Sequence, residues 1–257
     1  MSKVRHQMTG TTTSKGDTGM PLLETHALGK RYGDTIALDD LDLAVDAGEV
    51  VCLLGANGAG KTTTLNLLLG FLAPTSGEAR VDGRVVHTDP QAARARLGYL
   101  PEVVQLYPAL SGIETLRYFA DLSGKPRPDD EALHRTLSQV GLQRDAHARR
   151  VSAYSKGMRQ KLGLAIALSK GAQALLLDEP LSGLDPKAAN ELVALVRGLA
   201  ADGHAILAVT HDIFRAQQMA DRIGIMRQGR LVDMVDPRTM SAAEIEALYV
   251  HHLRDVA

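Results

Sequence analysis

Apolar and polar residues alternate in the early part of the chain. Leu41, Leu43 and Val45 occupy every second position, which predicts a strand with one buried face. The run Glu49–Leu54 is apolar after its first residue and stops at Gly55, which is typical of a strand buried on both faces. These two patterns predict β structure that leads into a loop rich in glycine.

A helical spacing follows this loop. Leu65, Leu68, Leu69 and Leu72 follow the spacing i, i+3, i+4, i+7, so they fall on one face of a predicted helix. We expect Pro74 and Gly77 to close this helix. A strand, a loop and a helix therefore follow one another directly.

The middle third of the chain is predicted to be helical. Ser111 and Glu114 form a capping-box pattern ahead of an apolar stripe. A second stripe ends at Gly141, and a third helix is predicted from about Ser155 until Gly171 stops it. We expect these helices to form a block of their own.

Strands and helices alternate again in the last third. The apolar runs 174–177, 205–209 and 223–226 predict strands, and Asp185–Pro186 predicts the start of the helix between the first two. Ser241 is expected to cap a final helix. This alternation predicts an α/β fold with a parallel sheet, interrupted by the inserted helical block.

Composition narrows the classes of function. The chain has 257 residues, 45% of them hydrophobic and 23% charged, as in soluble globular proteins. Its 29 basic and 30 acidic residues, with 6 Tyr, 3 Phe and no Trp, argue against a nucleic-acid partner. The longest apolar runs are far shorter than the ~20 residues of a spanning helix, and Cys52 stands alone. We expect a cytoplasmic protein.

Residues 55–62 form the strongest chemical motif. They read Gly-Ala-Asn-Gly-Ala-Gly-Lys-Thr and fit G-x-x-x-x-G-K-[ST] between a predicted strand and a predicted helix. In this phosphate loop, backbone N–H groups surround phosphate oxygens, Lys61 reaches the β- and γ-phosphates, and Thr62 ligates Mg²⁺. The residues expected to bind the nucleotide here are Gly55, Ala56, Asn57, Gly58, Ala59, Gly60, Lys61, Thr62 and Thr63.

The second motif is an apolar strand that ends in Asp178 and Glu179. Ligands of open α/β sheets bind at the carboxyl ends of the strands, so Asp178 is placed to hold Mg²⁺. Glu179 points elsewhere and is suited to polarising an attacking water. Taken alone, a strand that ends in an acidic turn is an equally good interpretation. The phosphate loop upstream favours the functional one.

Five further segments make the chain resemble the ATP-binding subunit of an ABC transporter. Tyr32 resembles the aromatic residue that stacks on adenine, although a strand tyrosine in the core is the alternative. Residues 98–102 resemble the loop that senses the γ-phosphate and faces the membrane subunit. Residues 155–157 lie at the family signature, 182–185 resemble the dimer-contact loop, and His211 resembles the switch histidine.

Two segments depart from the family pattern. Glu102 stands where Gln is usual, and its carboxylate is still suited to Mg²⁺ or a water. The signature reads Tyr-Ser-Lys-Gly-Met in place of Leu-Ser-Gly-Gly-Gln. Ser155 and Gly157 are retained, whereas Lys156 adds a charge and Met158 lacks an amide. These variants resemble ABC-2-type exporters, including the ATPase that serves copper-site maturation of nitrous oxide reductase.

The resemblance spans roughly residues 22–232 and implies the organisation of the chain. It implies a RecA-like parallel-sheet core with an N-terminal antiparallel β part, in an ATPase domain at 21–235. The helical subdomain is expected at about 101–171 and a helical tail at 236–257. Residues 1–20 have almost no apolar content and are expected to be disordered.

The resemblance also implies the chemistry and the partners. Glu179 and His211 are the implied catalytic residues, ATP the implied nucleotide, and Thr62, Asp178 and Glu102 the implied Mg²⁺ ligands. Two chains, as a homodimer or as paired ATPase subunits, are expected to sandwich two ATP molecules and to drive a separate integral membrane permease, with export favoured. The chain would then lie on the cytoplasmic face of the cell membrane.

Three other functions compete with transport. A soluble ABC-class ATPase of translation would resemble a tandem duplicate, and one of DNA repair would carry a long coiled coil, whereas the chain has one phosphate loop and no sustained heptads. A small-molecule kinase or a GTPase leaves residues 155–157 and His211 unexplained, and no Asn-Lys-x-Asp motif occurs. A regulatory nucleotide-binding module would not need Glu179 and His211, so basal ATPase activity discriminates it.

Overall fold

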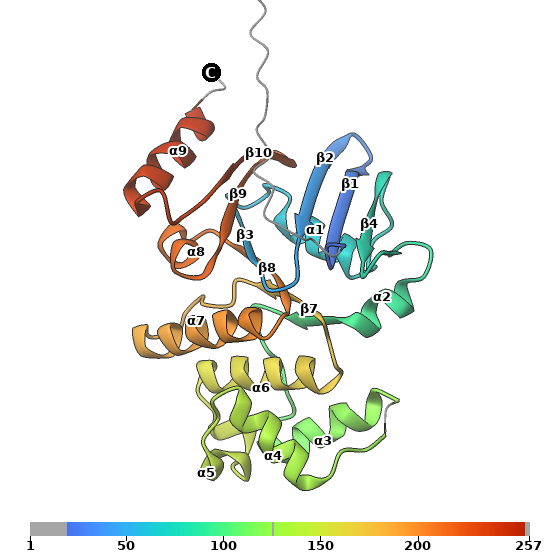
Figure 1. Cartoon of the computed structure of the whole chain (residues 1–257), viewed down its shortest axis with the longest axis vertical. Helices are drawn as coiled ribbons and strands as arrows, with labels where there is room; N and C mark the ends of the chain where they lie inside the picture. Colours follow the sequence, from blue (N-terminus) through green and yellow to red (C-terminus); the bar gives the residue numbers. More distant parts are fainter. Residues whose placement is uncertain (1–19, 125, 255–257) are drawn as a thin grey trace, which may run out of the picture.

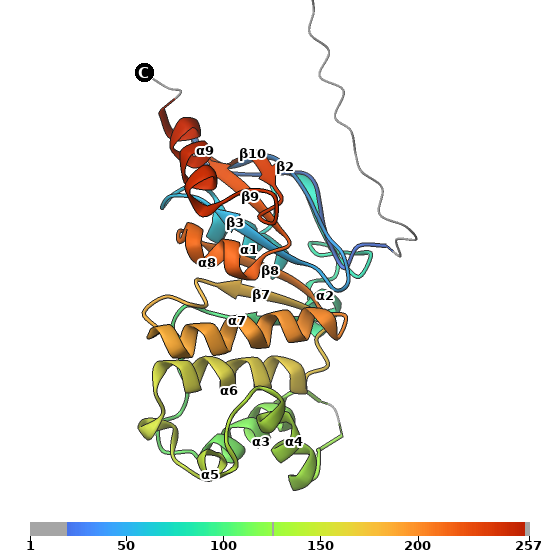
Figure 2. The same cartoon turned by 60° about the vertical axis from the view of Figure 1, so that its left-hand side comes forward.

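The computed structural model describes residues 20–124 and 126–254. The segment expected to be disordered, 1–20, lies outside the described residues except for Met20. Figure 1 shows two sheets at one end of the molecule and a block of helices at the other, and Figure 2 shows the same separation after rotation.

A six-stranded sheet forms the centre of the fold, in the order β10-β9-β3-β8-β7-β6. Its five strands from β9 to β6 are parallel, and β10 pairs antiparallel with β9. This confirms the parallel sheet predicted from the alternation of strands and helices. The strands are β3 (Val50–Leu54), β6 (Leu97–Leu100), β7 (Ala174–Asp178), β8 (Ala205–Thr210), β9 (Arg222–Arg227) and β10 (Arg230–Val235).

Strand β3 is buried on both faces, as its apolar sequence predicts. Val50, Cys52 and Leu54 belong to the apolar cluster that includes the helical block. Val51 and Leu53 belong to a second cluster, between this sheet and a smaller one. Because successive side chains point to opposite faces, β3 joins the two clusters and fixes the position of the loop that follows it.

The smaller sheet is antiparallel, with the order β2-β1-β4-β5, and confirms the expected N-terminal antiparallel part. Its strands are β1 (Leu23–Tyr32), β2 (Thr35–Val45), β4 (Ser76–Val81) and β5 (Arg84–Val85). The alternation at Leu41–Val45 does mark β2. Strand β1 has no such alternation, because register shifts between Thr25 and Lys30 interrupt its pairing.

Helix α1 (Lys61–Leu68) is shorter than its apolar stripe predicts. Gly70 adopts a φ of +65°, a left-handed conformation that ends a helix, so Leu72 lies beyond it and Pro74 does not close it. The expected extension to Pro74 was therefore wrong. Helix α1 still packs its leucines into the core between the two sheets.

The helices α3 to α6 form the predicted block, and their sequence caps are confirmed. Ser111 and Glu114 make a full capping box at α3, and Ser155 caps α6. Figure 2 shows α3, α4 and α5 on the side of α6 that faces away from the sheets. The elements are α3 (Gly112–Leu122), α4 (Asp130–Gln139), α5 (Arg144–His147), a 3₁₀ turn (Val151–Ala153) and α6 (Lys156–Ser169).

The remaining helices complete the α/β layers. Asp185 caps α7 through the N–H groups of Lys187 and Ala188, with Pro186 as its first residue, as predicted. No helix within residues 20–124 and 126–254 has the length and apolar content needed to cross a membrane. These helices are α2 (Pro90–Arg96), α7 (Pro186–Ala201), α8 (Ile213–Met219) and α9 (Ala242–Arg254).

Candidate functional site

The loop between β3 and α1 has the backbone that its sequence motif requires. Gly58 and Gly60 adopt φ values of +81° and +105°, which glycine permits without strain. A Cβ on Gly60 would lie 2.8 Å from the carbonyl oxygen of Ala37. No side chain caps α1, so its first N–H groups are open to an anionic ligand. The cradle therefore fits phosphate oxygens.

Lys61 closes the loop on itself. Its side chain is buried, and Nζ donates hydrogen bonds to the carbonyl oxygens of Gly55 and Ala56, the latter at 3.1 Å. Burial lowers the pKa of Lys61, and the charges of Glu179 and Asp178 act in the opposite direction. The predicted phosphate-binding lysine thus lies within electrostatic reach of the predicted acidic residues.

Three acidic residues come together at the carboxyl ends of β6 and β7. Burial raises the pKa of Asp178, and the charges of Glu179 and Glu102 raise it further. The Tyr99 hydroxyl donates to Asp178 Oδ2 at 3.4 Å, and burial, with Asp178 beside it, raises the pKa of Tyr99 to about 12. Asp178 is therefore a crowded carboxylate whose negative charge favours a cation.

The donor set at this edge fits Mg²⁺ bound together with a phosphate. The oxygens of Asp178, Glu102 and Thr62 are the hard ligands that Mg²⁺ prefers. Within residues 20–124 and 126–254, no three His, Cys, Asp or Glu side chains are grouped closely enough to hold a metal by themselves. Mg²⁺ commonly binds through one or two carboxylates and completes its shell with water and substrate phosphates. A phosphate in the loop would supply those oxygens.

Glu179 and His211, the two residues predicted to be catalytic, are in contact. The Glu179 carboxylate lies 2.7 Å from His211 Nδ1 and accepts a hydrogen bond of 2.9 Å from Thr210 Oγ1. Its side chain is 14% exposed, against 64% for His211. The Glu179 backbone has a φ of +44° and donates to Val209 O at 2.9 Å. Two adjacent parallel strands thus aim this carboxylate.

Glu102 is held from two sides. Ser182 Oγ donates to its carboxylate at 3.2 Å, and Gln160 Nε2 donates to its backbone oxygen at 3.2 Å. Ser182 follows Glu179 closely in the chain, whereas Gln160 belongs to α6. The loop after β6 is therefore connected both to the acidic edge and to the helical block.

Tyr32 is a surface residue at the end of β1. Its side chain is 47% exposed, so the alternative of a core tyrosine is wrong. Lys30 Nζ lies 5.2 Å from the ring centroid, which is cation–π distance. Nearly half of the Tyr32 surface is therefore exposed to solvent. A cavity of about 330 Å³ also lies beside the phosphate loop, lined by Ala56, Asn57, Gly58, Ala59, Met226, Arg227 and Gln228.

Comparison with known proteins places the chain in a family. The family model described as ABC transporter matches residues 38–182, more than half of the chain. The chain belongs to the ABC transporter family. The Nod factor export ATP-binding protein I of Paraburkholderia xenovorans (strain LB400) is 35% identical, and the match covers 87% of this chain and 73% of that protein.

Two further comparisons support the assignment of the chain to the ABC transporter family. The probable multidrug ABC transporter ATP-binding protein YbhF of Escherichia coli (strain K12) is 35% identical over 90% of this chain, which spans 40% of YbhF's length. A solved structure, the ATP-binding subunit of an ABC transporter, is 30% identical with a TM-score of 0.78 over 91% of this chain and 100% of that one. The expected RecA-like cassette fold is confirmed.

The ABC signature position lies away from the phosphate loop. Ser155 is exposed, and its Oγ accepts from Met158 N at 3.2 Å. Gly157 is buried, and a Cβ on it would lie 3.0 Å from Cβ of Ala188, so it allows α6 to pack on α7. Figures 1 and 2 show β7 and α7 between α6 and α1. The structure therefore does not bring Ser155 and Gly157 to this chain's own phosphate loop.

Sequence reasoning missed two residues around the ABC site, Thr210 and Gln160, and one contact, that of Ser182 with Glu102. Thr210 directly precedes His211, so its position at the end of β8 was a usable indication. Ser182 lies in the expected dimer-contact loop, but its bond to Glu102 crosses between distant segments. Gln160 is a polar residue on an otherwise apolar helix face, and the sequence alone does not indicate which group it contacts.

Proposed function

We propose that this chain binds ATP with Mg²⁺, hydrolyses it, and drives a separate membrane permease as a transporter subunit. The observation that carries the proposal is the contact of Glu179 with Thr210 and His211 beside a phosphate loop in an ABC family chain. A regulatory nucleotide-binding module would have no use for a carboxylate aimed in this way.

The proposed reaction depends on positioning and electrostatics more than on covalent chemistry. The loop N–H groups and Lys61 hold the phosphates once Lys61 releases the carbonyls of Gly55 and Ala56. Thr62 and Asp178, with Glu102 nearby, would hold Mg²⁺, and the ion would supply positive charge at the phosphates. Tyr32 stacks on adenine through its exposed ring.

Glu179 is the proposed general base. Its carboxylate accepts a proton from the attacking water, while the Thr210 hydroxyl and His211 fix its orientation through bonds of 2.9 and 2.7 Å. The His211 side chain is more exposed than that of Glu179, so its second ring nitrogen remains available for the γ-phosphate.

A dimer completes the proposed site. An isolated phosphate loop is open to water and has few donors for transition-state charge. Ser155 caps α6 and Gly157 lies in its first turn. Figures 1 and 2 show α7 between α6 and α1, which favours use of this helix start by a second chain. We therefore propose a head-to-tail pair of ATPase subunits, in which Ser155 of one chain faces the ATP of the other.

The proposed permease contact lies on the helical block. Val103 and Tyr107, beyond Glu102, and Tyr118 and Leu122, on α3, are exposed apolar residues, and the Tyr107 and Tyr118 rings pack edge to face at 5.4 Å. Aromatic residues of this kind are enriched in protein interfaces. The ABC family assignment supports a membrane permease as the partner, and the segment at 98–102 resembles the loop that faces it.

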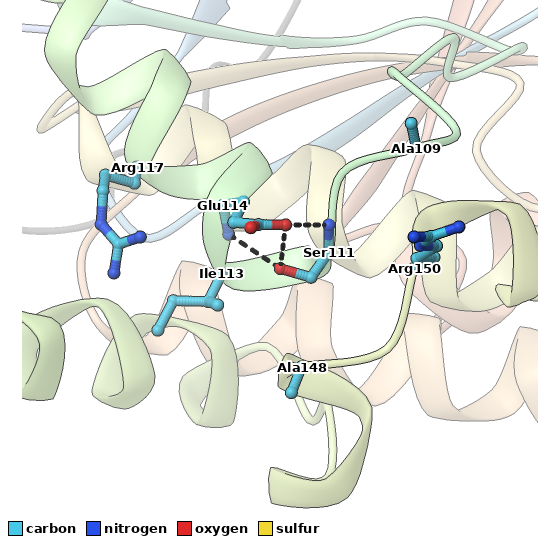
Figure 3. Close-up of a pocket in the computed structure, with 7 residues that line it drawn as sticks. All are labelled: Ala109, Ser111, Ile113, Glu114, Arg117, Ala148 and Arg150. Carbon is cyan, nitrogen blue, oxygen red and sulfur yellow. Dashed lines mark hydrogen bonds between the residues drawn. The ribbon is translucent and has the colours of Figure 1, made fainter.

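A cavity of about 470 Å³ lies beside this surface (Figure 3). Arg117 and Arg150 lie on either side of Glu114, whose carboxylate already accepts from Ser111 N and Oγ at 2.7 Å. Arg117 already donates to Asp130 at 2.7 Å, so Arg150 is the guanidinium that we propose for an acidic side chain of the permease. The lining residues are Ala109, Ser111, Ile113, Glu114, Arg117, Ala148 and Arg150.

The name of one relative, the Nod factor export ATP-binding protein I, supports export as the direction of transport. We propose that the chain lies on the cytoplasmic face of the cell membrane, where the permease would hold it. The identity of the cargo belongs to the permease in this proposal.

The function is tested by Glu179→Gln. We expect ATP turnover to fall by about 100-fold or more, because a general base contributes 10²–10⁴. ATP binding should persist, so the variant should collect as an ATP-bound dimer in light-scattering chromatography. Glu191→Gln is the matched control. Glu191 is an exposed carboxylate on α7, and it pairs with Lys161 of α6. Normal turnover in Glu179→Gln would contradict the role of Glu179.

A further inference from the structure

Helix α6 packs unusually close to strand β6. A Cβ on Gly98 would lie 2.6 Å from Cβ of Ala167, and a Cβ on Gly163 would lie 2.6 Å from Cδ1 of Leu100. Both glycines therefore permit an approach that larger residues would block. The two elements form a contact with little room for independent movement.

Gln160 continues the same row of contacts. Positions 160, 163 and 167 are spaced by three and four, so they share one face of α6. Their partners Gly98, Leu100 and Glu102 follow one another at every second position along β6 and beyond its end. The amide of Gln160 thus meets the chain where the strand has stopped and the loop begins.

The side chain of Gln160 is not explained by stability alone. It is 1% exposed, and among the described residues its Oε1 has no hydrogen-bond partner. An unpaired buried oxygen is unfavourable, and an apolar side chain of the same volume would avoid it. What the amide provides is the Nε2 bond of 3.2 Å to the carbonyl oxygen of Glu102.

Glu102 is also the residue that connects this contact to the acidic edge. Its carboxylate accepts from Ser182, and its charge raises the pKa of Asp178. At the other end, α6 begins beside Ser155, the residue proposed to face the partner's ATP. One amide therefore lies between the start of α6 and the carboxylates that face the phosphates.

We propose that Gln160 is a positioning residue that ties the loop of Glu102 to α6, so that the loop and the helical block move together. This inference rests on the proposed function only for its effect on turnover. The tie itself is a property of the folded chain and has its own readout.

The tie is tested by amide hydrogen exchange across residues 102–106 without nucleotide. Gln160→Met keeps the volume and removes the donor, so these amides should exchange about 5-fold faster or more. Gln217→Met is the matched control, because Gln217 Nε2 also donates to a backbone oxygen, that of Met240 at 2.8 Å, far along the chain from β6. Unchanged exchange in Gln160→Met would overturn the inference.

Turnover separates positioning from simple stability. In the full chain with ATP and Mg²⁺, Gln160→Met should lower kcat by about 10-fold while KM for ATP changes by less than about 2-fold. Its melting temperature should be no lower than that of Gln217→Met. Gln160→Leu, which has a similar volume and no donor, should reproduce the kcat loss.

The outcomes distinguish the two proposals. If the wild type hydrolyses no ATP, the proposed function fails while the exchange result still decides the tie. If the wild type is active and both Gln160 variants match it in kcat and in exchange, the inference fails alone. A fall in melting temperature with kcat per folded molecule unchanged would assign Gln160 a structural role and contradict positioning.

Discussion

At the scale of single residues, neighbours in the sequence have opposite environments. Asp178 is crowded by two other carboxylates, and burial with their charges raises its pKa. Glu179 next to it turns through a φ of +44° and gains hydrogen bonds from Thr210 and His211. The negative charge of Asp178 is thus unfavourable until a cation binds, whereas the orientation of the Glu179 carboxylate is fixed by hydrogen bonds.

Asp178→Asn is expected to stabilise the chain without nucleotide at neutral pH. The pKa of Asp178 is higher in the folded state than in the unfolded state, so the folded state binds its proton more tightly. The cost of ionising it is complete above the raised pKa and vanishes below the ordinary pKa of aspartate. Thermal unfolding should therefore give a Tm higher by about 2–4 °C at pH 7.5 and an equal Tm near pH 3.5.

Glu246→Gln serves as the control for this pH series, because Glu246 is an exposed carboxylate on α9. Its Tm difference from the wild type should stay near zero throughout. An Asp178→Asn variant that is less stable than the wild type at pH 7.5 would contradict the crowding described for Asp178.

The sequence predicted the residues of the site far better than their contacts. The phosphate loop and the acidic strand end were identifiable because fixed spacing encodes them locally. The bond from Gln160 to Glu102 was not, since it joins positions 58 apart and depends on how α6 lies on β6. The burial of Gly157 against Ala188 was hidden for the same reason.

At the scale of elements, capping residues and glycines at the helix ends decided which predictions were correct. Helix α6 begins and ends where Ser155 and Gly171 indicate, because a cap and a left-handed glycine act on adjacent residues. Helix α1 stopped early at Gly70, a residue inside an apolar stripe that periodicity alone counts as helical. Strand β1 was expected only from the family resemblance, because its bulges break the alternation that periodicity would detect.

Gly98→Ala tests the close packing of α6 on β6. The new Cβ would lie 2.6 Å from the Cβ of Ala167, a rigid neighbour, so one element must move. We expect a loss of about 1–3 kcal/mol in the free energy of unfolding, measured by urea titration.

Gly198→Ala is the opposite case on α7, where a Cβ meets nothing within 4 Å. It should stabilise the chain by about 0.4–1 kcal/mol, because alanine favours a helix. Equal changes in the free energy of unfolding for the two substitutions would show that the α6–β6 contact can accommodate a methyl group.

At the scale of the whole molecule, the two sheets and the helical block lie at opposite ends (Figure 1). The phosphate loop belongs to the sheet end, and the exposed rings of Tyr107 and Tyr118 belong to the helical end. The contact of α6 with β6 joins them. A partner bound at the block therefore has a short physical route to Glu102.

The double variant Tyr107→Ser, Tyr118→Ser is expected to weaken attachment to membranes of the source cells by about 30-fold, since two buried interface aromatics that contribute about 1 kcal/mol each together contribute about 2 kcal/mol. Co-sedimentation with those membranes measures the effect. Basal ATPase activity should stay within about 2-fold of the wild type, because neither ring lies at the carboxylates.

Phe214→Ser controls for loss of an exposed aromatic, because Phe214 is 56% exposed but lies on α8. Its sedimentation should match that of the wild type. Equal sedimentation of the double variant and the wild type would remove the helical block as the proposed docking surface.

Lys61 holds two carbonyl oxygens of its own loop, and this makes the loop a competitor for its own ligand. An incoming anion must displace neighbours that are tethered at contact distance and therefore never diffuse away. A small singly charged anion offers little in exchange, whereas a triphosphate brings several oxygens to the lysine and to the free N–H groups together. We expect such internal competition to discourage occupancy by chloride and to reserve the loop for polyphosphates.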